Sequence, residues 1–303
     1  MALDKQLQEV VTLFFGITVE AFPFVVLGIL VSLAIQNLPF EKFVSRFIPK
    51  NRYFSHFFIA LFGVFMPVCE CGNIPVARQM LQKGLKVSHV ITFLLSAPIL
   101  NPITFWSTYA AFSYDKTIVV YRMLGGFLIA SIIGIIFSFK KNQHEFLDGK
   151  FYETKCCITH IHHKGKKDIK SKLVSNLDYF VSEFGVMFKM LTFGAAVAAL
   201  SQAFIPREVI VSLGYNPILS ILSMMLLAFV ISICSTVDAF LALSYANTFT
   251  KGSIVSFLIF GPMVDMKIFT MLKSTFKVKF LVLLSVLVAL FTIFTGLLIN
   301  LIG

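Results

Sequence analysis

The chain has 303 residues, of which 57% are hydrophobic and only 14% are charged, and 35 of them are phenylalanine. This composition excludes a soluble domain with a polar exterior and indicates a membrane protein. The formal net charge of +11 at pH 7 comes mostly from one polar segment and from the ends of the apolar runs. Basic residues in such positions favour the anionic headgroups of a lipid bilayer, so we expect no nucleic-acid partner.

Apolar runs that are long enough to cross a bilayer as helices, which takes about 20 residues each, recur along the whole chain. They lack the alternating pattern of barrel strands, so we predict an all-α integral membrane protein. The first run contains Glu20 and is followed by no small-residue cleavage site, so we expect it to remain in the mature protein. The eight predicted spans are residues 8–36, 55–82, 87–112, 118–139, 181–204, 217–247, 252–274 and 278–302.

A basic segment separates the first four predicted spans from the last four. We therefore divide the chain into a first transmembrane repeat at 1–139, a basic loop at 140–179 and a second transmembrane repeat at 180–303. Residues 140–172 carry nine lysines and four acidic residues, which by the positive-inside rule predicts a cytoplasmic loop. We expect the protein in the cell (inner or plasma) membrane, and eight crossings would place both termini in the cytoplasm as well. If one segment in each half is re-entrant, the number of crossings per half is odd instead.

The two halves of the sequence resemble each other. LPFEKFVSRF from Leu38 aligns with IPREVIVSLG from Ile205, and FLLSAPILNP from Phe93 aligns with FLIFGPMVDM from Phe257. We interpret this as the duplication of a four-helix unit, in either parallel or inverted arrangement, as in many secondary transporters. The alignment places Glu20 with Glu183, Cys69 and Asn73 near Cys234 and Asp238, and Asn101 with Asp265.

Proline and glycine interrupt the predicted spans near their middle. Proline removes a backbone donor and clashes with the preceding turn, so we expect broken helices there. Broken helices inside a membrane expose backbone groups, which is tolerated where they line a cavity or a ligand. The matching positions in the two halves therefore predict a central transport site. The predicted helix-breaking residues are Pro67, Gly72, Pro75, Pro98, Pro102, Gly261 and Pro262.

Polar residues cluster around these interruptions. Cysteine sulfur is a soft ligand that suits zinc, copper(I) and thiophilic metalloids. Carboxylates inside a membrane usually face a cavity and often carry protons, which makes Glu20, Glu70, Asp238 and Asp265 candidates for proton coupling. Packing of the cysteines and helix capping by the asparagines remain open alternatives. The predicted substrate-binding residues are Cys69, Glu70, Cys71, Asn73, Asn101, Cys234, Asp238 and Asp265.

Lys267 and the central loop carry two further candidate features. Lys267 falls on the opposite face of a regular helix from Asp265, so we expect it to extend towards a membrane interface. The loop sequence CCITHIHH offers zinc ligands at a spacing that fits none of the usual structural zinc sites, so a metal site and a solvated basic loop both stay open. Its candidate ligands are Cys156, Cys157, His160, His162 and His163.

The motifs PVCECGNIPVARQMLQKG and FLLSAPILNPITF, with STVDAFLAL and FLIFGPMVDMK in the second half, resemble those of predicted permeases. The resemblance is to the family that contains the ArsP-type organoarsenical exporters and the YraQ-like proteins, and covers nearly the whole chain except the central loop. CECG is closest to a branch described as one subunit of a two-component permease. The resemblance implies an eight-helix inner-membrane permease; the positions it carries over are Cys69, Cys71, Gly72, Pro75, Pro98, Asn101, Pro102, Asp238, Gly261, Pro262 and Asp265.

We therefore expect a secondary permease that exports a small thiophilic metalloid or metal species, such as a trivalent organoarsenical, by alternating access. No GxxxxGKS phosphate loop is present, and we expect neither enzymatic activity nor a cofactor. A permease for an unrelated solute, held by Asn73, Asn101, Asp238 and Asp265, is one alternative. A membrane subunit or scaffold that transports nothing itself is another. A companion membrane subunit and a homo-oligomer both remain open as partners.

Overall fold

The computed structural model describes residues 2–37, 49, 51–66, 68–140, 143–149, 169–204 and 216–302. Within these ranges the chain is helical, and its only β pairing is an isolated bridge between Leu147 and Phe276. The elements before the basic segment are α1 (Ala2–Asn37), α3 (Arg52–Phe62), η1 (Gly63–Phe65), α4 (Glu70–Gln82), α5 (Val87–Leu100), α6 (Pro102–Ala111) and α7 (Lys116–Ser138). They are followed by η2 (Gln143–Phe146), α9 (Ile169–Phe204), α11 (Pro217–Ile231), α12 (Asp238–Ser244), α13 (Lys251–Met263), α14 (Met266–Leu272) and α15 (Val278–Ile302).

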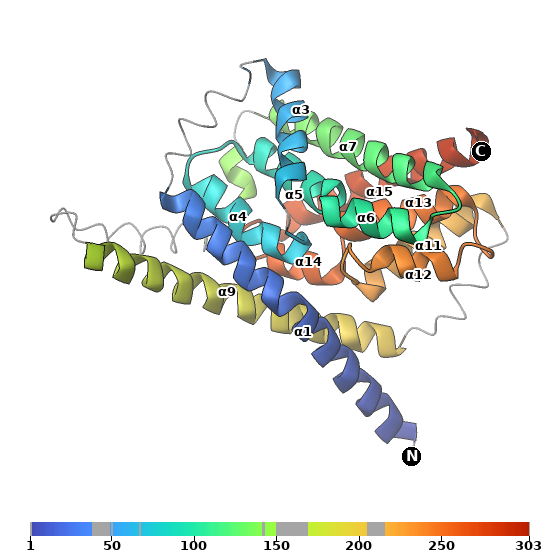
Figure 1. Cartoon of the computed structure of the whole chain (residues 1–303), viewed down its shortest axis with the longest axis horizontal. Coiled ribbons are helices and arrows are strands. Elements are labelled where there is room, and N and C mark those ends of the chain that lie inside the picture. Colours follow the sequence, from blue (N-terminus) through green and yellow to red (C-terminus); the bar gives the residue numbers. More distant parts are fainter. Residues whose placement is uncertain are drawn as a thin grey trace.

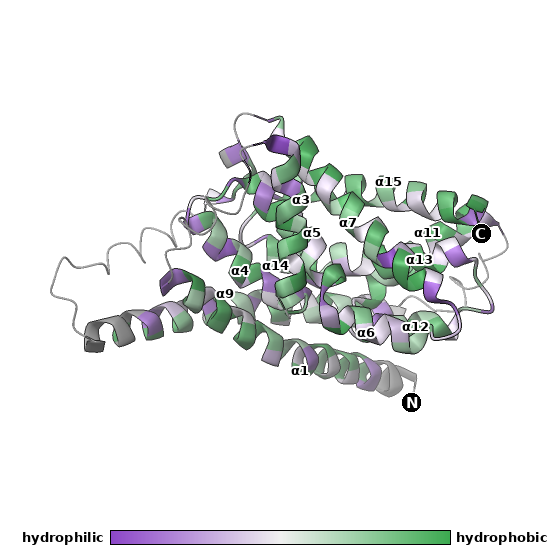
Figure 2. Cartoon of the chain, turned by 45° about the horizontal axis from the view of Figure 1, so that its top comes forward, coloured by the Kyte–Doolittle hydropathy of each residue, from purple (hydrophilic) through white to green (hydrophobic). Residues whose placement is uncertain are grey.

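The outer helices present apolar side chains to the surroundings. Figure 2 shows hydrophobic residues along most of α7, α11 and α15, and in α15 Val282, Leu290 and Phe294 are all at least half exposed. An apolar exterior of this kind is what a bilayer solvates. The predicted all-α integral membrane fold is thus confirmed, and the molecule is a multi-pass membrane protein. In place of eight spans, the described residues contain six helices long and apolar enough to cross, within Leu7–Asn37, Val87–Ala111, Lys116–Ser138, Asn176–Gln202, Lys251–Leu272 and Val278–Ile302.

The predicted span 55–82 is a hairpin of two shorter helices. The first helix, α3, runs parallel to α5: Ser55 hydrogen-bonds His89 near the start of both, and Gly63 packs on Ala97 near the end of both. Helix α4 then runs back, and beyond its last residue the Lys83 ammonium donates to a carbonyl in the last turn of α1. The hairpin therefore enters the bundle and leaves it at the same end.

The predicted span 217–247 is also a hairpin, and it enters from the other end. Helix α11 runs parallel to α13, since Ser220 Oγ lies 2.6 Å from Ser253 Oγ near their starts and Ala228 faces Gly261 near their ends. The chain breaks at residues 232–237, and α12 runs back towards the turn at 245–250 that leads into α13. Neither hairpin crosses the bundle, which accounts for the loss of two predicted spans.

Two ends of the bundle follow from these contacts. The loop end comprises residues 83–86, 143–148 and 273–277, joined by the hydrogen bond from Lys277 N to Phe146 O. The terminal end comprises residues 112–115, 245–250 and the last turn of α15, joined by the Asp115–Lys251 ion pair. Figure 1 shows both chain termini on the right, away from η2 at the loop end on the left. Both termini therefore lie opposite the start of the basic segment, whereas eight spans would have placed them on its side.

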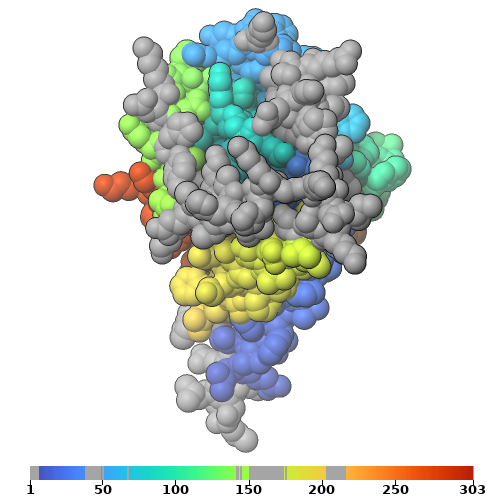
Figure 3. Space-filling model, turned by 90° about the vertical axis from the view of Figure 1, so that its left-hand side faces the viewer, coloured from blue at the N-terminus to red at the C-terminus, as the bar shows by residue number. Residues whose placement is uncertain are grey.

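Helix α1 packs along α9 and on α4. It runs antiparallel to α9, as the hydrogen bond between Ser32 and Tyr179 shows. Its contact with α4 depends on two glycines, because a Cβ atom on Gly28 would lie 2.2 Å from the carbonyl oxygen of Gly72. Figure 3 views the molecule from the loop end, with α3 at the top and the pair α9 and α1 at the bottom.

The helix breaks do not coincide with most of the residues predicted to cause them. The breaks lie before α4, at Asn101, at 232–237 and at Val264–Asp265. Pro102 opens α6 at its first position, where a missing backbone donor costs nothing. In contrast, Gly72, Pro75, Pro98, Gly261 and Pro262 lie inside helices α4, α5 and α13, so the prediction that they break those helices is wrong. Packing on all sides outweighs the single backbone bond that a proline removes.

Candidate functional site at the helix breaks

The four helix breaks meet in the interior of the bundle. There α4 packs on α14 and α12 packs on α6, so each re-entrant helix contacts the split helix of the other half. Helices α4, α6, α12 and α14 all begin at this centre, and the residues at or next to their first positions are Glu70, Asn101, Asp238 and Asp265. A helix N-terminus stabilises negative charge and side-chain acceptors, which explains why carboxylates and an amide occupy these positions.

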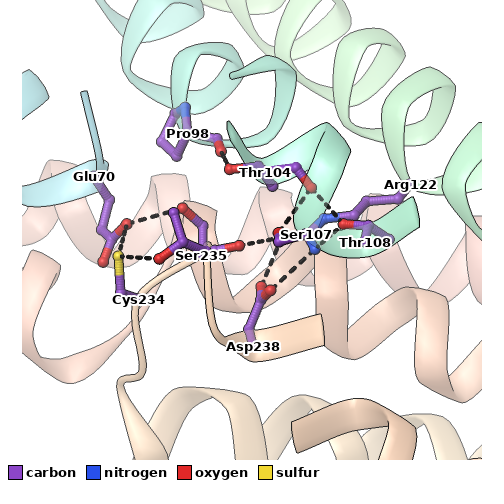
Figure 4. A network of polar contacts seen from close by, with 10 residues as sticks. Glu70, Pro98, Thr104, Ser107, Thr108, Arg122, Cys234, Ser235 and Asp238 are labelled. Carbon is purple, nitrogen blue, oxygen red and sulfur yellow. Dashed lines mark hydrogen bonds and ion pairs between the residues drawn. The ribbon is translucent and has the colours of Figure 1, made fainter. Parts of the chain in front are cut away.

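Two thiols and a carboxylate form the core of the site. One ligand atom each from Cys69, Glu70 and Cys234 lie within 4.8 Å of one another, and all three residues are buried. The carboxylate oxygen Oε2 of Glu70 accepts from Ser235 Oγ at 3.2 Å and from the Cys234 thiol at 3.8 Å (Figure 4). Residues from the two halves of the sequence therefore meet at this site. Cys71 is fully buried in the first turn of α4 and lies outside this group of three.

Lys267 completes the core of the site, contrary to the expectation that it reaches an interface. Its ammonium lies 3.3 Å from Glu70 Oε1 and 3.3 Å from the carbonyl oxygen of Ser232, and its side chain is 2% exposed. Burial of an ammonium requires a charged or polar partner, which Glu70 supplies. Ser232 itself has a left-handed backbone (φ 50°) that turns the chain out of α11. Lys267 thus joins the tips of the two hairpins.

The two asparagines hold the breaks in place. Asn101 accepts from the backbone N–H of Ile103, which caps α6, and its Nδ2 donates to the carbonyl oxygen of Val68. Asn73 Nδ2 donates to the same carbonyl at 3.4 Å. Asp265 caps α14 by accepting from Ile268 N at 2.5 Å. The structure therefore gives Asn101 and Asp265, which the sequence alignment pairs, the same capping role.

Two buried acceptors near the centre have no hydrogen-bond partner among the described residues. They are the side-chain oxygen Oδ1 of Asn73 and the oxygen Oδ2 of Asp265. Buried acceptors without a partner are rare and call for an explanation such as a bound ligand. A cavity lined by Glu70 and apolar side chains, Met263 and Phe276 among them, adjoins the core of the site. The cavity has a volume of about 20 Å³, which is room for roughly one water molecule.

The remaining predicted proton-coupling residues are placed differently. Asp238 is held by Arg122, whose two terminal nitrogens lie 3.0 and 2.7 Å from its two oxygens. Glu20 lies half-buried on α1, within electrostatic reach of Glu70 and Lys267. Its partner in the repeat alignment, Glu183, instead bonds an arginine towards the loop end. Pro67, Cys156, Cys157, His160, His162 and His163 lie outside the described residues.

Three residues of this region were missed from the sequence, namely Arg78, Arg122 and Lys267. Each is a cation inside a predicted apolar span, at 55–82, 118–139 and 252–274. Ionisable residues within a membrane usually face the interior and have a partner, so their positions were themselves a signal. The partners lie 105, 116 and 197 residues away along the chain, and only the fold reveals them.

Comparison with known proteins places the chain in a family. Residues 6–301 match the family ArsP_1, which is described as a predicted permease. The chain belongs to this permease family. It is 38% identical to UPF0718 protein YcgR of Bacillus subtilis (strain 168) over 286 residues, which cover 94% of each chain. It is 35% identical to the putative two-component membrane permease complex subunit of Streptococcus mutans serotype c over 279 residues, which cover 92% of this permease and 91% of the relative.

No solved structure matches this permease. The resemblance inferred from PVCECGNIPVARQMLQKG and the other three motifs is confirmed, and the family is described as one of permeases, that is, of transporters rather than enzymes.

Proposed function

We propose that this permease exports a thiophilic metalloid or metal species, of the trivalent organoarsenical kind, by alternating access. The observation that supports this substrate is the group formed by Cys69, Glu70 and Cys234, enclosed at the meeting point of four helix breaks. Transport is supported by membership of the permease family. The outward direction is supported by the resemblance to ArsP-type exporters.

The chemistry of the group suits a soft, three-coordinate centre. A trivalent arsenical such as methylarsenite exchanges two As–O bonds for two As–S bonds, and the two thiol protons leave with the hydroxyls as water. Cys69 and Cys234 supply the two sulfurs from opposite hairpins, and Glu70 adds an oxygen next to them. Soft thiol ligands discriminate against hard ions such as Mg²⁺. Binding therefore bridges the two halves of the permease.

The second candidate is a role as one subunit of a larger permease. The observation that favours it is the relative from Streptococcus mutans, which is named as a subunit of a two-component membrane permease complex. A companion membrane subunit would leave the central site as described, so this candidate is compatible with the first. It predicts that the chain alone transports nothing until the companion is present.

We further propose that the permease resides in the cell membrane with the basic segment in the cytoplasm, as the positive-inside rule predicts. Because both termini lie opposite that segment, they are then on the outer side, which revises the expectation of cytoplasmic termini.

The test is elemental mass spectrometry of cells that express the permease and are exposed in turn to methylarsenite, arsenite, zinc, copper and cadmium. We expect the wild type to lower the cellular content of one element, and Cys69→Ser with Cys234→Ser to abolish that effect. The matched control is Cys156→Ser with Cys157→Ser, which removes two thiols outside the proposed site.

The outcomes separate the hypotheses. If the central double variant still lowers the element, the thiols are not the site. If loss follows Asp265→Asn instead, a hydrogen-bonded solute is favoured. If neither the wild type nor any variant changes the cellular content of any element, although the protein is present in the membrane, the subunit candidate is favoured.

A further inference from the structure

Among the described residues, three buried ion pairs connect residues 1–139 with residues 180–303. The central one, Glu70–Lys267, belongs to the site already described. The other two, Arg78–Glu183 and Arg122–Asp238, take no part in the thiol group. A buried ion pair is weak evidence for a purely stabilising role, because apolar residues of the same size often stabilise as well or better. Their positions therefore call for another explanation.

The first pair closes the loop end of the bundle, and we call it with its partners the loop-end lock. Arg78 Nε lies 2.7 Å from Glu183 Oε1, and both side chains are 1% exposed or less. The same guanidinium donates through one terminal nitrogen to the carbonyl oxygen of Ser274 at 2.9 Å and to the Thr275 hydroxyl at 3.1 Å. It thus binds α9 and the turn between α14 and α15 to the first hairpin.

The second pair lies between the thiol group and the terminal end, and we call it with its partners the terminal-end lock. Arg122 on α7 makes a two-pronged contact with Asp238, the first residue of α12. It also donates to the Thr108 hydroxyl at 2.8 Å and to the carbonyl oxygen of Ser235 at 3.3 Å. Figure 4 shows how this lock binds α6 and α7 to the second hairpin.

The thiol group lies between the two locks. Arg78 follows Glu70 by eight residues on α4, which places it about 12 Å from the site towards the loop end. Asp238 follows Cys234 by four residues on the path towards the terminal end. The Ser235 residue belongs to both the site and the terminal-end lock, since its hydroxyl donates to Glu70 and its carbonyl accepts from Arg122. Glu70 and Arg122 therefore share Ser235 as a hydrogen-bonded neighbour.

We propose that the two locks are the gates of this permease: the loop-end lock closes the site to one side of the membrane and the terminal-end lock closes it to the other. The inference rests on the proposed function, because it assumes that the thiol group is a transport site. Each lock joins the two halves through one guanidinium, so either path opens when its lock separates while the other remains closed. The structure has both locks formed and its thiols buried, which is the occluded state expected between the two open ones.

The test measures the access of a membrane-impermeant maleimide to the central cysteines from each side of the membrane. The background carries Cys156→Ser and Cys157→Ser, so that Cys69, Cys71 and Cys234 are the remaining thiols. Each lock is removed as a pair, so that no buried charge is left without its partner: Arg78→Met with Glu183→Gln, and Arg122→Met with Asp238→Asn. The matched control, Lys251→Met with Asp115→Asn, removes a partly exposed ion pair at the terminal end.

We expect each lock variant to raise the labelling rate at least about tenfold from its own side only, because labelling proceeds through the open state whose population rises. The control should label as slowly as the background. Equal acceleration from both sides, acceleration from the wrong side, or no acceleration in a protein that elutes as a folded species would each overturn the inference.

Where a paired variant does not fold, Arg78→Lys or Arg122→Lys replaces it. A lysine keeps the charge but cannot make the forked contacts, so a smaller increase from the same side is expected. Labelling requires no transported solute, so the two proposals can fail separately. If each lock variant is labelled faster from its own side only but the cells export no metalloid, the gates are supported and the proposed substrate is refuted.

Discussion

At the scale of single residues, Lys267 supplies the positive charge that pairs with Glu70 in the central site. Its ammonium neutralises the buried Glu70, while its second contact is to the carbonyl of Ser232 at the tip of the other hairpin. Removing one member of a buried pair leaves a charge that the interior cannot solvate. The carboxylate of Glu70 then depends on Ser235 and Cys234 alone.

We predict that Lys267→Met lowers the free energy of unfolding by about 3–5 kcal/mol. Adding Glu70→Gln should recover most of that loss, because the uncompensated charge is gone. Thermal unfolding in detergent measures both variants. Lys251→Met is the control, since it breaks a partly exposed ion pair at the surface, worth about 0–1 kcal/mol. A loss of stability in the double variant as large as in the single one would contradict a charge-pair role for Lys267.

Asp115, in the turn at the terminal end, supplies a prediction on pH. The hydrogen bond from Lys251 holds the pKa of Asp115 below its usual value, and the side chain also accepts from Thr117 N. Because the pKa is lower in the folded state, this stabilisation is present above about pH 4 and is lost as the pH falls through the folded-state value. We predict that Asp115→Asn lowers the melting temperature at pH 7 by about 2 °C at most. The difference from wild type should shrink below pH 4; a difference that grows there would contradict this reading.

At the scale of elements, α1 and α4 approach each other closely where Gly28 meets Gly72. The carbonyl oxygen of Gly72 occupies the place that a Cβ atom on Gly28 would need. Since backbone atoms cannot move aside as a flexible side chain can, a methyl group there must push the re-entrant hairpin away from α1.

We predict that Gly28→Ala costs about 1–3 kcal/mol of stability and weakens transport, because α4 carries Glu70 and Arg78. Gly16→Ala on the same helix is the matched control, since no atom of another element lies within 4 Å of its Cβ position. Unfolding in detergent and cellular metalloid content are the two measurements. Equal effects of the two substitutions would show that the approach of α1 to α4 is not limiting.

Part of these elements followed from the sequence. Apolar runs of helical length predict the spans, and Cys69, Glu70 and Cys234 stood out because polar residues interrupt those runs. The break at 232–237 contains no proline, and its turn depends on the left-handed backbone of Ser232, which no residue pattern announces. Pro75 and Pro98 were misleading for the opposite reason, since tertiary packing preserves the helices around them.

At the scale of the whole molecule, the order of elements in the two halves is similar but their hairpins enter from opposite ends. The α3–α4 hairpin enters from the loop end, and the α11–α12 hairpin enters from the terminal end. We propose that the halves are inverted repeats, each with three crossings and one re-entrant hairpin. This arrangement places the contact between the two repeats, and with it the thiol group, near the middle of the membrane.

We predict that reporters fused at residue 303 and inserted in the basic segment report opposite sides of the membrane. A reporter in the turn at 245–250 should agree with the C-terminal one, and a reporter in the turn at 83–86 should agree with the basic segment. An eight-span arrangement predicts instead that the C-terminus and the basic segment share a side.

The account depends on the two hairpins offering one thiol each to the same substrate atom. The most direct measurement is tandem mass spectrometry of the purified permease, in the Cys156→Ser, Cys157→Ser background, after treatment with phenylarsine oxide. We predict one arsenic per chain, bound to Cys69 and Cys234 with the release of one water, and no such bridge in Cys234→Ser. Failure of folded protein to take up arsenic, or a bridge between Cys69 and Cys71 in its place, would contradict the central site.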